Sequence, residues 1–168
     1  PPTSAPPASA TPPTPPTAIG PVSPPTSEEE AVTAAEQAIS AWLRIRGEVN
    51  AAGGSDTAPL EETTTGLALD IVLADAARVA SNGWKTEGAL AFERIAAYAQ
   101  EANGNPPYDH VTVSACQDGS GYKVFESDGT TPVQQPAARG GKIDYQAVYD
   151  RDGERWLVSN VVSVGGSC

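Results

Sequence analysis

The chain has 168 residues and a net charge of −11, which comes from 21 acidic and 10 basic side chains. An acidic surface repels nucleic-acid phosphates, so we expect no nucleic-acid partner. The basic residues are scattered, which leaves no cluster for anionic lipids, and no apolar run reaches the about 18 residues of a membrane-spanning helix.

The first 27 residues are uncharged, and eleven of them are proline. Proline fixes the backbone φ angle and removes the amide donor, so neither a helix nor a sheet can propagate there. We therefore predict a disordered, extended spacer over 1–27 and one domain over 28–168. Because the chain begins with Pro1 rather than Met, we expect that a preceding segment has been removed.

A long amphipathic helix is predicted over 28–50. Apolar residues recur there at helical spacing, with Trp42 on the buried side. Ser27 followed three residues later by Glu30 has the pattern of a capping box. The run of glutamates also suits the positive end of the helix dipole.

A second helical region follows Pro59. Residues 60–65 are predicted as a short piece of their own, because this Thr-rich stretch is poor helix material. From Leu67 onward the apolar residues share one helical face, and Ser81-Asn82-Gly83 predicts where that helix ends.

The sequence of segment 89–102 is compatible with either a helix or a strand. It is rich in helix-forming residues, which favours a helix. It also alternates with a period of two, which would place Phe92, Arg94 and Tyr98 on one face of a strand and Glu93 and Ile95 on the other.

Strands are predicted in the last third of the chain. The sequence VTVSAC alternates between apolar and polar residues, and 142–150 and 155–164 do so more loosely. Asp-Gly pairs mark turns, and YDRDGERW predicts a hairpin that joins 142–150 to 154–164.

The two cysteines, Cys116 and Cys168, are too few and too far apart for a metal or redox motif. His110 is the only histidine and cannot complete a Cys–His site, so we expect no metal. The Pro-rich leader and the missing Met are typical of exported proteins, in which cysteines pair. We favour a single disulfide, and two separate thiols in a reduced protein are the alternative.

The order of these features resembles the nuclear-transport-factor-2-like fold, with N-terminal helices, then Gly83-Trp84, then long strands. It is similar in particular to secreted and lipid-anchored actinobacterial proteins with such a domain. That similarity covers roughly 30–168. It rests on a strand that ends in Cys116, the Asp-Gly hairpin, the sequence of 155–158 and the closing Cys168.

The resemblance implies an α+β domain in which two to three helices pack on a strongly curved, mainly antiparallel, cone-like sheet. It favours a strand over 86–101 and implies a disulfide between Cys116 and Cys168. In such proteins a low-complexity linker often follows a lipid-modified cysteine. Any such membrane attachment would have been lost here with the segment before Pro1.

A cone-like sheet implies a cavity beneath it. The resemblance makes Trp42, Glu93, Tyr98, Asp144 and Tyr149 candidates to line that cavity. No position matches the catalytic Asp and Tyr of cone-fold isomerases, so we assign no catalytic residue and expect no cofactor.

Two further pairs of polar residues could act together. An Asp–His pair can orient an imidazole for general-base catalysis, but adjacent strand residues point to opposite faces, so we expect Asp109 and His110 not to pair. Asp70 and Asp75 are five residues apart and share a helix face poorly, and we expect Asp70 at the surface.

These observations favour an exported cell-envelope protein with a non-catalytic binding or scaffold domain displayed on a Pro-rich spacer. Its partner would be a protein or an apolar small molecule. One alternative is a small-molecule-binding protein or an isomerase or dehydratase that uses the cone cavity. The other is that the Pro-rich tail itself is the ligand of a partner domain.

Overall fold

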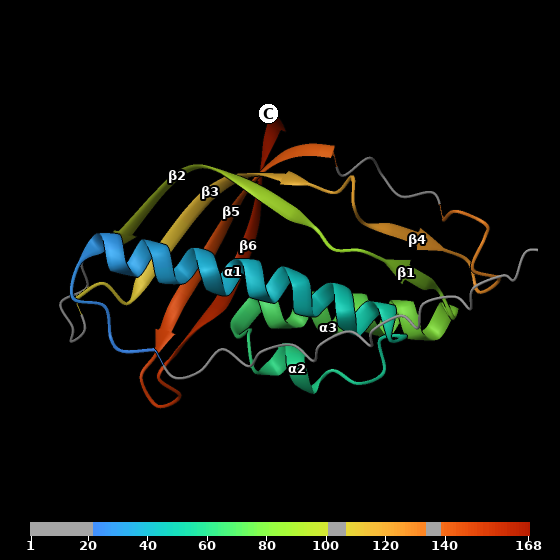
Figure 1. Ribbon diagram of the computed structural model, residues 1–168, viewed down its shortest axis with the longest axis horizontal. Helices are drawn as coiled ribbons and strands as arrows, with labels where there is room; N and C mark the ends of the chain where they lie inside the picture. Colours follow the sequence, from blue (N-terminus) through green and yellow to red (C-terminus); the bar gives the residue numbers. More distant parts are fainter. Residues whose placement is uncertain (1–21, 101–106, 134–138) are drawn as a thin grey trace, which may run out of the picture.

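A computed structural model describes residues 22–100, 107–133 and 139–168 of the chain (Figure 1). Most of the predicted spacer, residues 1–21, lies outside the described residues. Three helices come first and a mainly antiparallel sheet follows, so the predicted α+β class is confirmed. The elements are α1 (Glu28–Ala51), α2 (Ala58–Glu61), α3 (Gly66–Asn82), β1 (Lys85–Glu87), β2 (Ala91–Gln100), β3 (His110–Asp118), β4 (Lys123–Phe125), β5 (Arg139–Asp150) and β6 (Arg155–Ser167).

Helix α1 begins and ends where the sequence predicts. The side chain of Ser27 accepts a hydrogen bond from the Glu30 amide at 3.2 Å, which satisfies one of the free donors of the first turn. The Glu30 carboxylate, however, accepts from the amide and the hydroxyl of Thr26, at 2.9 and 2.6 Å. In a standard capping box the Glu30 carboxylate would accept from the amide of the cap residue Ser27. Here it accepts from the amide of Thr26, one residue earlier.

The prediction for 60–65 is wrong in detail. The short helix α2 ends at Glu61, and the chain then runs alongside β6. The amide of Thr65 donates to the carbonyl of Val158 at 2.9 Å, and the amide of Val158 donates to the carbonyl of Thr63 at 3.0 Å. Pairing with the sheet gives these backbone groups partners that a helix of β-branched threonines would provide less well.

Four strands form the main sheet in the order β2-β3-β5-β6, and every neighbouring pair is antiparallel. The predicted hairpin is confirmed, because Asp150 of β5 lies opposite Arg155 of β6. Within the segment 89–102, which the sequence left open between helix and strand, residues 91–100 form strand β2, and residues 101 and 102 lie outside the described residues. The strand expected over 86–101 is interrupted, however, since β1 pairs with β4 in a separate two-stranded sheet and Gly88, at φ 73°, follows β1.

Strand β2 changes face at a bulge. Arg94 lies opposite Ala115 and Ala96 lies opposite Ser114, so Ile95 is an extra residue without an opposite partner. Before the bulge Phe92 faces the helices, and after it Ala97 does. The predicted alternation is therefore wrong beyond Arg94, because one extra residue reverses the direction of every side chain that follows.

The core lies between α1 and one face of the main sheet, which we call the inner face (Figure 1). Trp42 of α1 meets Tyr145 of β5 edge to face, with ring centroids 6.1 Å apart, and Phe92 lies 5.6 Å from the same tyrosine ring. Val72 and Ala76 of α3 join the same cluster. These side chains pack against one another beneath the sheet.

Six residues of the predicted spacer belong structurally to the domain. Val22 packs against the core, and Pro25 is buried. The Tyr149 hydroxyl donates to the Val22 carbonyl at 2.7 Å, and the Val22 amide donates to the Glu154 carbonyl at 2.7 Å. The domain therefore extends to residue 22, beyond the predicted boundary at 28.

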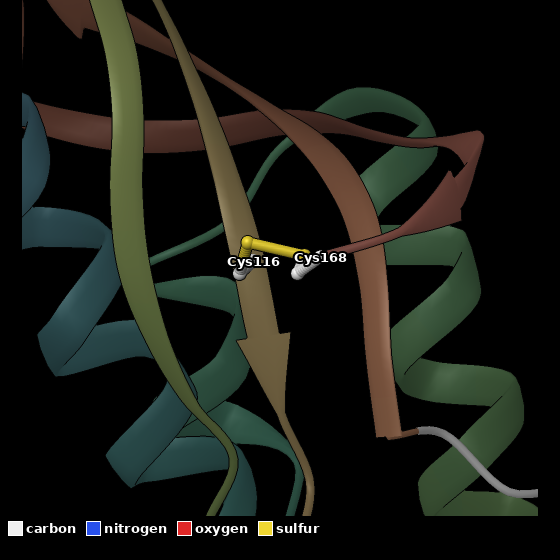
Figure 2. Close-up of a disulfide and its surroundings, with 2 residues drawn as sticks. All are labelled: Cys116 and Cys168. Atoms are coloured by element: carbon white, nitrogen blue, oxygen red, sulfur yellow. A yellow bond between two sulfur atoms is a disulfide. The ribbon is translucent and has the colours of Figure 1, made fainter.

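The C-terminus is held against the sheet by a disulfide. Figure 2 shows the end of the chain passing across β5 so that Cys168 reaches Cys116 on β3. Gly165 and Gly166 have φ angles of 73° and 83°, a left-handed backbone that glycine adopts without strain. These two glycines lie in an irregular stretch between the pairs Ile143–Ser163 and Gly141–Ser167, where the chain bends toward Cys116.

Candidate functional site

An open groove of about 480 Å³ lies between α1 and α3. It is lined by Arg46 from α1 and by Ile71, Ala74, Asp75 and Arg78 from α3. Side chains three or four residues apart lie on one side of a helix, which is why the four α3 residues face the groove together. The groove combines two guanidinium groups, one carboxylate and an apolar wall.

Asp75 receives hydrogen bonds on both carboxylate oxygens. Its Oδ2 accepts from Arg46 Nη2 at 2.8 Å, from Arg46 Nε at 3.2 Å and from Asn50 Nδ2 at 3.1 Å. Its Oδ1 accepts from Arg78 Nη2 at 2.8 Å. The carboxylate thus fixes the positions of two arginines, one from each helix.

A buried amide extends this network away from the groove. Asn50 is 1% exposed, and its Nδ2 also donates to the Tyr122 hydroxyl at 3.0 Å. Its Oδ1 has no hydrogen-bond partner among the described residues. Tyr122 directly precedes β4, so the network connects the two helices to the small β1–β4 sheet.

The surroundings shift two pKa values. Burial alone would raise the pKa of Asp75, but the Arg46 charge and the hydrogen bonds from Arg46, Arg78 and Asn50 outweigh it, so this pKa lies below its usual value. Burial raises the pKa of Tyr122, and the Asn50 hydrogen bond only partly opposes that shift. Asp75 is therefore ionised and Tyr122 neutral at neutral pH.

The groove carries a local excess of positive charge. Among the side chains that line the groove, Arg46 and Arg78 share the single carboxylate of Asp75, which leaves the lining with one unit of positive charge in a chain whose net charge is −11. The Arg78 guanidinium also lies 6.0 Å from the centroid of the Trp84 ring, at the limit of a cation–π contact. Such a site attracts anions in a protein that otherwise repels them.

The sheet face opposite the helices, which we call the outer face, is a second candidate surface. Tyr98, Thr112, Gln146 and Asn160 lie opposite one another across the four strands. Asn160 Nδ2 donates to Gln146 Oε1 at 3.2 Å, and Tyr98 is 48% exposed. This row is polar and uncharged, and an aromatic ring stands at its edge.

The residues predicted to line a cavity are divided between the core and the outer face. Trp42 and Tyr149 are buried among core side chains on the helix side of the sheet. Asp144 lies on the outer face, where it accepts a 2.6 Å hydrogen bond from Ser114. Glu93 is exposed next to the inward-facing Phe92, and the bulge at Ile95 turns Tyr98 outward, so these five side chains do not converge.

The expectation for His110 is wrong. His110 Nδ1 lies 2.8 Å from Asp109 Oδ1, so the two side chains pair. Asp109 precedes the first residue of β3, and the alternation of side chains that holds within a strand does not apply to it. Arg151 approaches the other carboxylate oxygen of Asp109 at 3.4 Å, and the histidine side chain remains more than half exposed.

Two further observations concern cofactors and membranes. Within the described ranges, no group of three or more His, Cys, Asp or Glu side chains is arranged to hold a metal ion. None of the helices in the described part of the chain is long and apolar enough to cross a membrane.

Sequence reasoning missed the groove. It compared Asp75 only with Asp70, along one helix, whereas the main partner of Asp75 is Arg46, 29 positions earlier on another helix. The pairs Asp75–Arg78 and Arg46–Asn50 at helical spacing were the available local signals. Neither pair reveals that the two helices place these residues side by side.

Comparison with known proteins identifies no relative by sequence, since neither a family model nor a curated protein matches the chain. Among solved structures, the intermembrane space region of chloroplast protein ARC6 aligns with a TM-score of 0.44 and 16% identity, over 80% of this chain and 97% of that one. A de novo designed β-sheet protein aligns with a TM-score of 0.32 and 18% identity, over 83% and 92%. Likenesses of this strength give no indication of function, and the nuclear-transport-factor-2-like resemblance stays a prediction.

Proposed function

We propose that this chain is an exported cell-envelope protein whose domain binds a protein partner through the outer face of its sheet and catalyses no reaction. The Pro-rich segment would act as the spacer that displays this domain. Within this proposal the domain is of the nuclear-transport-factor-2-like kind. The Cys116–Cys168 disulfide supports an extracytoplasmic location, because disulfides persist in oxidising compartments and are rare in the cytosol.

The proposal that the domain binds a protein rests on the outer face of the sheet. Most buried apolar residues of the described helices join the inner face in one core, whereas the outer face presents exposed apolar side chains. Ile95, Tyr98, Val162 and Val164 are each at least 38% exposed there or at its edge. Aromatic and aliphatic side chains beside uncharged amides are the composition expected of a protein-binding patch.

The arrangement of polar groups supports the non-catalytic form of the proposal. Glu93 and Asp144 lie on the outer face, while the Tyr149 hydroxyl is used to hold Val22. Tyr98 shares this exposed face with the two acids, and Tyr149 lies on the other side of the sheet, so these candidates do not meet in one enclosed cavity.

This proposal can be tested by two measurements in the organism that makes the protein. Protease added to intact cells should digest the chain, and a chain that is protected until the cells are lysed would contradict the proposed location. A photo-crosslinking amino acid in place of Tyr98 should give one discrete adduct, which Val162→Lys abolishes.

Leu67 provides the matched control for the crosslinking experiment. It is 56% exposed on α3, so it is as accessible as Tyr98 but lies away from the outer face. The same crosslinker at position 67 should give no such adduct. Equal adducts at both positions, or none at position 98, would contradict binding through the outer face.

A further inference from the structure

An apolar strip on α3 leads into the groove between α1 and α3. Leu67, Ile71 and Ala74 follow one another at intervals of four and three residues, and Arg78 continues the same line. Leu67 is 56% and Ile71 42% exposed, although both are large apolar side chains. At 1.5 Å per residue the apolar part from Leu67 to Ala74 is about 11 Å long, and Arg78 lies about 6 Å beyond it along the helix. The length and narrow width of the strip suit an extended hydrocarbon chain.

The two ends of the strip differ in charge. At one end, Arg46 and Arg78 share the carboxylate of Asp75, which leaves the local positive excess described above. Asp70 is exposed on α3 beside the apolar part of the strip. A bound anionic group would be repelled near Asp70 and attracted at the arginine end, so charge fixes the direction in which an amphiphile would lie.

The guanidinium groups are already held in place. Arg46 is fixed by two donors to one Asp75 oxygen, and its side chain is only 21% exposed. Arg78 is held by the other oxygen and lies near Trp84. Since a guanidinium has five N–H groups, each arginine keeps donors beyond those that Asp75 accepts. Donors that are positioned before binding lower the entropic cost of holding a ligand.

We propose that this groove binds a carboxylate carried on an unbranched apolar chain. The carboxylate would accept hydrogen bonds from Arg46 and Arg78, and the chain would lie along Ala74, Ile71 and Leu67. Asp75 would act as the positioning residue that orients both guanidinium groups. This site is separate from the outer face of the sheet, so the two proposals can fail independently.

Titration calorimetry of the purified full-length chain with decanoate tests the proposal. We expect one decanoate to bind per chain, and 1-decanol and decyltrimethylammonium to bind at least about tenfold more weakly. The alcohol keeps the apolar chain but lacks the charge, and the ammonium compound reverses it. Equal binding of decanoate and decanol would overturn the proposal, because it would show that the carboxylate is not recognised.

Two pairs of variants locate the site. Arg78→Gln and Ile71→Asp should each weaken decanoate binding at least about tenfold, since one removes the cationic partner and the other places a charge on the strip. Arg44→Gln removes a charge from the same helix as Arg46, and Ile95→Asp changes an exposed isoleucine on β2. Both controls should bind decanoate as the parent does.

All four residues are exposed, so we expect each variant to fold. A thermal melt of each variant checks this. No binding of decanoate to the parent at millimolar concentration would overturn the proposal. So would an equal loss of affinity in Arg44→Gln and Arg78→Gln, because that result would indicate a general effect of charge. If Arg78 acted only by holding Asp75 and decanoate bound elsewhere on the chain, Ile71→Asp would leave decanoate binding unchanged, and that result would overturn the proposal.

Discussion

Arg46 and Asp75 are 29 positions apart in the sequence, and two N–H groups of the arginine donate to one oxygen of the aspartate at 2.8 and 3.2 Å. The contact joins the middle of α3 to the last third of α1. Both side chains are mostly buried, so solvent screens this ion pair less than it screens the exposed pair Arg44–Glu48.

Replacement of Asp75 by Asn should destabilise the fold. The change leaves Arg46 without its ionic partner in a partly buried place, and we expect the free energy of unfolding to fall by about 2 kcal/mol. Urea unfolding measures this loss. Asp70→Asn, on the exposed side of the same helix, should change stability by less than about 0.5 kcal/mol. Equal losses in the two variants would contradict a structural role for the Asp75 network.

The contribution of Asp75 should depend on pH. Its folded pKa lies below the ordinary value of 3.8, so the unfolded chain takes up the proton first as pH falls. The stabilisation is complete above about pH 4 and is lost as pH falls through the folded pKa. Urea midpoints of the parent and Asp75→Asn should therefore differ by a constant amount between about pH 5 and 7 and converge below about pH 4. A gap that widens in acid would contradict the lowered pKa.

Loss of the disulfide should lower stability substantially. Cys116 and Cys168 are 52 positions apart, and in the chain-entropy model the closure of such a loop contributes about 4 kcal/mol. Cys168→Ser should lose most of this amount in urea unfolding. The reduced parent protein should match the variant, because both lack the same bond. A loss below about 1 kcal/mol would show that the bridge constrains the unfolded chain little.

Removal of the Tyr149 hydroxyl should release the segment before α1. Tyr149→Phe removes the 2.7 Å hydrogen bond to the Val22 carbonyl but keeps the ring against Trp156, 5.7 Å away between centroids. Loss of this hydrogen bond should make local opening of the segment easier by about 1 kcal/mol. We therefore expect elastase to cleave near Val22 about fivefold faster. Mass spectrometry of the products measures the rate. Tyr98→Phe, on the outer face, should leave it unchanged, and equal acceleration in both variants would contradict the role of Tyr149.

Local physical chemistry in the sequence determined much of this architecture. The cap at Ser27, the left-handed stop at Gly83 and the hairpin around Asp152-Gly153 depend on residues close together in the chain, so they could be predicted. The composition of the chain likewise indicated one acidic domain behind a proline-rich leader.

Only the tertiary structure decided how the elements meet. Residues 91–100 have helix propensity but form β2, because pairing with β3 satisfies their backbone groups. The extra residue Ile95 then reverses the strand and places Tyr98 outside. The groove exists because two helices bring Arg46 beside Asp75. Contacts between distant segments depend on the packing of the whole chain, and no local pattern of residues specifies them.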